Sequence, residues 1–195
     1  MNRWGAVVCF VLLATPAAAE WQIKPFAGVA FGGSTTFVDA EEAAGQAHRL
    51  LGVNGALLGE VLGLEADVAR VPGFFQSGNG LFVLSSSVVT LTGNLVVAMP
   101  KRVFQYTLRP YFVAGAGILR AHIEPNLGTL PLANTRPAMD IGGGATGFLS
   151  DRLGVSWEIR HFRTIGRGGL SGVNVGLSGE QLAFWRATMA LAIRY

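Results

Sequence analysis

The sequence predicts an all-β fold, an eight-stranded antiparallel transmembrane β-barrel of the up-and-down type. Three observations support this prediction. Residues 185–195 alternate apolar side chains with polar or small ones and end on Tyr195, other segments repeat that alternation, and only 14% of the residues are charged. A period of two places the two sets on opposite faces of a strand. Soluble domains have about 25% charged residues, so this chain has too few to cover a soluble exterior.

The first nineteen residues have the pattern of a secretory signal peptide. Arg3 supplies the positive start, residues 7–13 form an apolar run, and residues 17–19 are three alanines, typical of a cleavage site. The run is shorter than the ~20 residues of a membrane-spanning helix, although a retained N-terminal anchor is the alternative. Two segments are therefore expected, a signal peptide at 1–19 and a barrel domain at 20–195. Cys9, the only cysteine, lies in the signal, so no disulfide or cysteine–metal site is expected.

Turn residues and alternation divide the barrel domain into eight strands. The expected strands are Trp21–Phe31, Arg49–Leu58, Leu64–Val71, Leu81–Ala98, Arg109–His122, Met139–Leu149, Arg152–Phe162 and Ala183–Tyr195. The connections between them alternate between long and short. Outer-membrane barrels have long outer loops and short periplasmic turns. Four loops are therefore expected at one end of the barrel, and the turns with both termini at the other.

The alternation identifies the two faces of these strands. The first strand has Trp21 and Ile23 on one face and Gln22 and Lys24 on the other. The second and third strands flank a short connection at 59–63. The fourth is the most apolar, but Thr90, Thr92 and Asn94 interrupt it at every second position, and its β-branched residues favour a strand over a helix. The loop at 123–138 separates the fifth strand from the sixth.

Composition favours a membrane barrel over a soluble one. The sixth and seventh strands meet at a turn near residues 150–151. One face of the seventh strand is apolar, with Leu153, Val155, Trp157 and Ile159, and the other face has Ser156, Glu158 and Arg160. A soluble barrel such as a lipocalin would turn the apolar face inward and cover the outside with charge. The shortage of charge makes the apolar face the outward one, which predicts contact with membrane lipid.

Aromatic residues gather near both ends of the expected strands. One group, at the end with the turns, is Trp21, Phe104, Tyr106, Phe148 and Tyr195. The other, at the end with the loops, is Phe31, Phe74, Phe75, Phe82, Phe162 and Trp185. This distribution predicts two aromatic belts at the membrane interfaces. The alternative is that aromatic residues simply favour strands.

Several strand motifs resemble the small bacterial outer-membrane β-barrel domain family, the OmpA-like or OmpX-like group. They are Arg109-Pro110-Tyr111 through Gly115-Ala116-Gly117, Asp140 to Gly144, Glu158 to Arg163, and Phe184 to Thr188. The resemblance covers essentially the whole mature chain. It implies an outer-membrane barrel, but not one activity, because this family has many functions.

Gly142, Gly144 and Gly147 have the G-x-G-x-x-G spacing of dinucleotide-binding loops. That motif requires a helix after the glycines, whereas another strand is expected here. We interpret these glycines as making room for bulky lumen side chains, and no cofactor is expected. The formal charge of +3 is spread along the chain without a basic stripe, so nucleic acid is not an expected partner.

Inward-facing charged residues are the best candidates for a functional site. Two groups are expected along the lumen. The group nearer the loops is Asp140, Glu158, Arg160 and Arg186, and the group nearer the periplasmic end is Lys24, Glu65, Asp67, Arg109 and Arg194. Arg160 and Arg186 should face each other with Glu158 between them. Because the lumen of eight strands is narrow, we interpret both groups as a structural plug, with a conducting path as the alternative.

His161 suggests one enzymatic alternative. Its expected position, outward near the outer interface, resembles that of the His-x-Ser pair in outer-membrane lipid A deacylases. Arg163 occupies the serine position here, so no enzyme is predicted.

The expected role is structural or in surface interaction at the outer membrane. The expected partners are outer-membrane lipid and, through the last strand ending at Tyr195, the barrel-assembly machinery; the sequence does not identify a loop partner. The alternatives are a small pore, a lipid-modifying enzyme and a soluble barrel for an apolar ligand.

Overall fold

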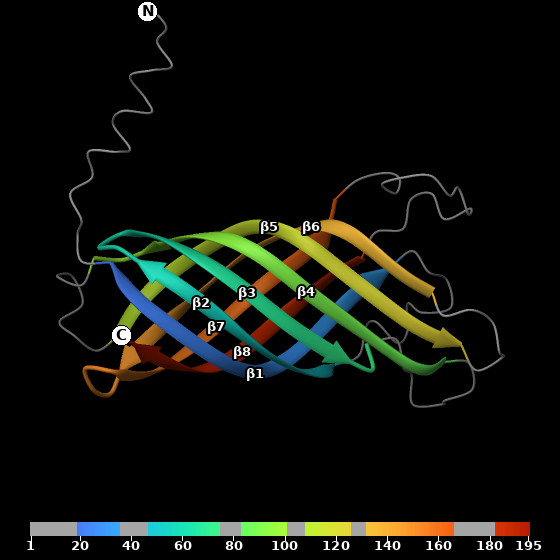
Figure 1. The fold of residues 1–195 in the computed structure, drawn as a ribbon, viewed down its shortest axis with the longest axis horizontal. Coiled ribbons are helices and arrows are strands. Elements are labelled where there is room, and N and C mark those ends of the chain that lie inside the picture. Colours follow the sequence, from blue (N-terminus) through green and yellow to red (C-terminus); the bar gives the residue numbers. More distant parts are fainter. Residues whose placement is uncertain (1–18, 36–46, 75–82, 101–107, 126–131, 166–181) are drawn as a thin grey trace, which may run out of the picture.

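The computed structural model is a closed barrel of eight antiparallel strands in which β8 pairs with β1 (Figure 1). It describes residues 19–35, 47–74, 83–100, 108–125, 132–165 and 182–195. The strands are β1 Glu20–Thr35, β2 His48–Leu58, β3 Leu62–Pro72, β4 Val83–Ala98, β5 Leu108–Pro125, β6 Leu132–Phe148, β7 Leu153–Thr164 and β8 Leu182–Arg194. The predicted fold class is confirmed. In the described ranges, no helix is both long and apolar enough to cross a membrane.

One strand is clearly longer than expected. β6 begins at Leu132 rather than at Met139, and it pairs with β5 from its first residue. The longer strand contains Pro137, and proline cannot donate a backbone hydrogen bond. It lies one residue beyond the β6–β7 ladder, which ends at the pair Ala138–Thr164. At that position no ladder bond requires a donor from Pro137, while its carbonyl oxygen accepts from the Ile165 N–H (2.8 Å).

The two faces of the barrel have the predicted polarity. Apolar side chains of every strand point outward; Trp157 is 53% exposed and Ile141 62%. Polar and charged side chains point inward, and the Arg160 side chain is completely buried. An apolar exterior around a polar interior is the pattern of a barrel whose surrounding solvent is lipid.

The beginning of β1 and the end of β8 lie at the same end of the barrel, together with the turns between β2 and β3 and between β6 and β7 (Figure 1). The Tyr195 N–H donates to the Trp21 carbonyl (3.0 Å), which extends the β1–β8 seam. Residues 1–18 of the expected signal peptide lie outside the described residues.

The aromatic belts are only partly as expected. Trp21 and Tyr195 are exposed at the turn end, and Trp185 is exposed toward the loop end. Phe74 and Phe162, however, are completely buried inside the barrel, so assigning them to an interface was wrong. Residues Phe75, Phe82, Phe104 and Tyr106 lie outside the described residues.

Candidate functional site in the barrel lumen

Among the described residues, the lumen contains equal numbers of buried cations and carboxylates. Eight charged side chains are buried there: Lys24, Glu65, Asp67, Arg109, Asp140, Glu158, Arg160 and Arg186. Four are cations and four are carboxylates, so their formal charges cancel. Buried charges are tolerated when they are paired and hydrogen-bonded. The arrangement of the pairs therefore decides what the lumen can do.

Arg160 of β7 is the centre of these contacts. Its guanidinium donates to Glu65 Oε1 (2.5 Å), to Asp140 Oδ2 (3.1 Å) and to both carboxylate oxygens of Glu158. The partners come from β3, β6 and β7, so one side chain connects strands on different sides of the lumen. The five donors of a guanidinium make such multiple pairing possible.

Arg186 of β8 forms the second centre. Its Nη1 and Nη2 donate to the two oxygens of Asp67 (2.7 and 2.9 Å), a bidentate pair across the lumen. Glu158 Oε1 lies 3.6 Å from its Nη2. Arg160 and Arg186 are opposite each other in the β7–β8 register, and Glu158 separates their charges as expected.

The expected division into two groups along the lumen is wrong for Glu65 and Asp67. Glu65 forms a salt bridge with Arg160, and Asp67 forms one with Arg186. β3 lies across the lumen from β7 and β8, and the long arginine side chains span the distance between them. Position along a tilted strand does not give the height of a side chain in the barrel. The resulting lumen cluster consists of Glu65, Asp67, Asp140, Glu158, Arg160 and Arg186.

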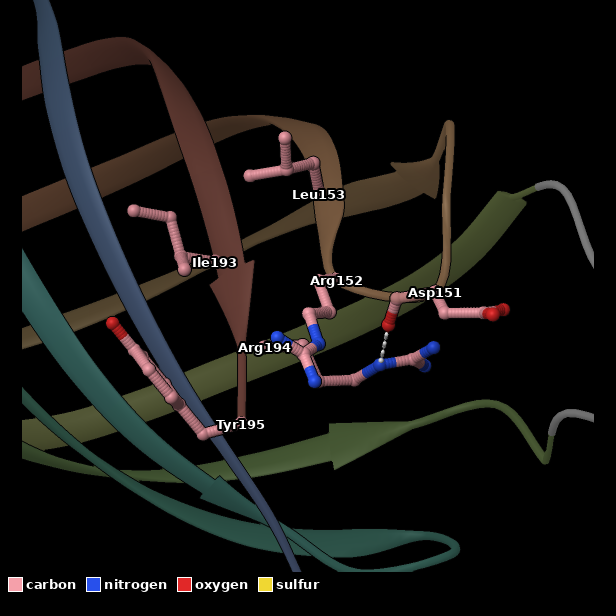
Figure 2. A pocket seen from close by; sticks show the side chains of 6 residues that line it. All are labelled: Asp151, Arg152, Leu153, Ile193, Arg194 and Tyr195. Atoms are coloured by element: carbon pink, nitrogen blue, oxygen red, sulfur yellow. Dashed lines mark hydrogen bonds between the residues drawn. The ribbon is translucent and has the colours of Figure 1, made fainter.

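Among the described residues, no salt bridge joins the other three predicted residues to the lumen cluster. The Lys24 ammonium lies 5.0 Å from the centre of the Tyr111 ring. Arg109 donates to the carbonyls of Met99, Gly59 and Glu60, which ties together backbone at the turn end. Arg194 donates from Nε to the Asp151 carbonyl (2.6 Å) and lines a hollow with residues 151–153, 193 and 195 at the same rim (Figure 2).

Neutral side chains that were not predicted from the sequence complete the cluster. The Tyr111 hydroxyl donates to Glu158 Oε2 (2.9 Å), and the Asn94 amide donates to Glu65 Oε1 (3.2 Å). Their inward parity was visible in the sequence, but nothing in the alternation shows which strands face each other across the lumen.

Apolar side chains pack beside the cluster, which was also not expected. Toward the loops the lumen is filled by an aromatic layer in which Phe184 stacks on Phe162 (5.2 Å between ring centres) and meets Phe74 edge-on (5.3 Å). The Arg186 guanidinium lies 4.7 Å from the Phe162 ring centre. A smaller apolar group toward the turns includes Leu58 and Val96. The aromatic layer thus lies between the charged centre and the loop end of the lumen.

The glycines of β6 make room for the cluster. Gly142 is paired with Arg160, and a Cβ atom on Gly142 would lie 2.3 Å from the Ile159 carbonyl oxygen and 2.7 Å from Arg160 Cγ. The G-x-G-x-x-G motif of a dinucleotide-binding loop is followed by a helix, whereas here the strand β7 follows the glycines. This agrees with the interpretation that the glycines make room for lumen side chains.

Gly142→Ala is therefore expected to lower the free energy of unfolding by about 1–3 kcal/mol, the usual cost of overpacking. Gly93→Ala is the matched control, because a Cβ atom there has nothing within 4 Å, and it should change stability by less than about 0.5 kcal/mol. Urea unfolding of both variants in detergent micelles measures the difference. Equal stabilities would show that β6 does not limit the lumen.

His161 points outward, and its ring lies 4.8 Å from that of Trp185. Arg163 is also exposed. The pair of aromatic rings is consistent with a place near the membrane interface.

No protein-family model matches the sequence, and no curated protein has a significantly similar sequence. Solved structures are similar. Outer membrane protein OprG from Pseudomonas aeruginosa has a TM-score of 0.62 at 11% identity, over 92% of this chain and 97% of its own. Neisserial surface protein A has a TM-score of 0.60 at 12% identity, over 88% and 95%. A major outer membrane protein from Thermus thermophilus has a TM-score of 0.55 at 15% identity, over 91% and 100%.

The fold is that of the small outer-membrane β-barrels. At these identities the likeness concerns the fold, and the lumen cluster is a property of this chain's own residues.

Proposed function

We propose that this protein is an integral outer-membrane barrel with a structural or surface-interaction role, in which the outer loops meet external partners. The main support for this proposal is the apolar exterior around a lumen filled with charged and aromatic side chains. A lumen closed by packed side chains is suited to holding the strands together rather than to passing solutes. No described side-chain arrangement favours the pore, the lipid-modifying enzyme or the soluble barrel.

This role requires that the protein be exported and inserted into the outer membrane. Residues 1–19 direct export and are removed, and the mature domain begins at Glu20. The barrel-assembly machinery then recognises β8. Exposed aromatic and apolar side chains on this strand, such as Trp185, Met189 and Tyr195, support contact with that machinery and with lipid.

Expression in a Gram-negative host should yield a mature protein that fractionates with outer membranes. Unboiled protein should migrate faster on a gel than boiled protein, because a closed barrel resists unfolding by detergent. Depletion of the assembly machinery should leave the exported chain in the slow form. Recovery from the periplasm without detergent would contradict the membrane proposal. Stepwise ion conductance of the purified protein in planar bilayers would contradict a filled lumen.

A further inference from the structure

Among the described strand residues, the charged side chains that point outward all lie toward the loop end of the barrel. Where the structure describes strand side chains, the charged residues that point outward are Arg49, Arg70, Arg120 and Arg163, all exposed and all in the loop-side part of their strands. Described outward carboxylates occur only at the turn end, as Glu60 and Asp151. The side chain of Glu124, farther along β5, lies outside the described residues.

Three of these arginines form one group, the arginine triad: Arg49, Arg70 and Arg120. Arg70 and Arg120 share one row of the sheet, because each is paired with Val89 between them. Two strand spacings separate their backbones by roughly 10 Å. Arg49 lies diagonally from Arg70, whose partner is Leu51, at about 7–8 Å. No ion pair with a described carboxylate neutralises any of the three.

The distance of the arginine triad from the turn end of the barrel corresponds to the outer boundary of the membrane. Its members lie eight to twelve residues from the turn-side ends of β2, β3 and β5. A strand tilted by about 35–45° climbs roughly 2.5 Å per residue, which places these residues about 20–30 Å above the turn end. The apolar band of an outer-membrane barrel is about 25 Å tall. The guanidinium groups therefore lie at the level of the outer-leaflet headgroups.

We infer that the arginine triad binds the phosphate groups of a phosphorylated lipid in the outer leaflet. Guanidinium groups match phosphate in planar, bidentate geometry. Three cations this close, none of them paired with a described carboxylate, repel one another unless an anion lies between them. Ser87 and His122 are paired in the next row toward the loops and add polar side chains beside Arg120. This inference rests on the proposed outer-membrane location.

Simple extension of arginine side chains to the interface is the competing explanation, because long cationic side chains commonly reach headgroups in this way. It predicts no preference for phosphate over other polar headgroups. A binding experiment with lipids that differ only in phosphate therefore separates the two.

The test uses the full-length protein, refolded in phosphatidylcholine vesicles. The vesicles contain either lipid A with both phosphates or the same lipid A with the phosphates removed. Wild-type protein should bind the phosphorylated form at least tenfold more tightly. The triple variant Arg49→Gln, Arg70→Gln, Arg120→Gln should bind the two forms equally. Arg152→Gln, which changes an exposed arginine at the opposite end, should behave as wild type.

Equal binding of both lipids by the wild type, or an unchanged preference in the triple variant, would overturn the inference. Competition by millimolar inorganic phosphate would also overturn it, since the site would then recognise the free ion. The heat-dependent gel shift, recorded for every sample, tests the barrel separately. A wild-type protein that shows the shift without lipid preference refutes only the triad, whereas absence of the shift refutes the membrane proposal.

Discussion

Replacing Arg160 with methionine is expected to lower the free energy of unfolding by about 3–5 kcal/mol, the usual cost of removing one partner from a buried ion pair. Arg160 donates to Glu65, Asp140 and Glu158. Without it, these buried carboxylates face one another beside the aromatic layer of the lumen. Urea unfolding in detergent micelles or vesicles measures the loss.

Two comparisons make this result specific to the cluster. Arg160→Met combined with Glu65→Gln and Glu158→Gln should recover part of the stability, because two of the three carboxylates left without Arg160 are neutralised. Glu158→Gln alone should cost less than Arg160→Met. Arg160 would still have Glu65 and Asp140, and Arg186 would still have Asp67. A loss in the triple variant equal to that of Arg160→Met would show that the carboxylates do not depend on this arginine.

The second large effect is expected on the opposite face of the sheet. Met189→Arg should destabilise the inserted barrel by about 2–4 kcal/mol, the cost of an arginine on the lipid face near the midplane. Met189 is 66% exposed and is paired with Trp157, in the middle of β8. Folding in lipid vesicles, followed by the gel shift across a urea series, measures the cost.

An arginine at a different depth in the membrane is the control for Met189→Arg. Leu191 lies on the same face of β8, two residues nearer the turn end, and Leu191→Arg should cost less because the penalty falls toward the interface. Equal, negligible costs at both positions would mean that this face does not contact lipid.

Most of the fold could be predicted because alternation is a local property of each strand. Seven of the strands lie close to their expected ranges, and the inward parity of Glu158, Arg160 and Arg186 is the one observed. The β7–β8 register also agrees with the prediction that Arg160 and Arg186 face each other.

What could not be predicted depends on distances across the lumen. The pairs Arg160–Glu65 and Arg186–Asp67 join strands that are not neighbours in the sheet. Their alignment depends on the stagger accumulated around the barrel, which no single segment encodes. The aromatic layer was missed for a related reason. Phe162 has the inward parity of the charged residues, but its place near a strand end suggested a membrane interface.

The connectivity of the lumen cluster makes barrel closure a cooperative event. Asp67 and Arg186 are 119 residues apart in sequence, and Glu65 and Arg160 are 95 apart. Neither pair can form in an open sheet that lacks β7 and β8, so a partly assembled barrel has buried charges without partners. Contacts between residues distant in sequence form late and slowly. Until they form, the unpaired charges destabilise the intermediates relative to the closed barrel. The cluster thus favours an all-or-none barrel, and its loss in Arg160→Met should broaden the urea transition as well as shift its midpoint.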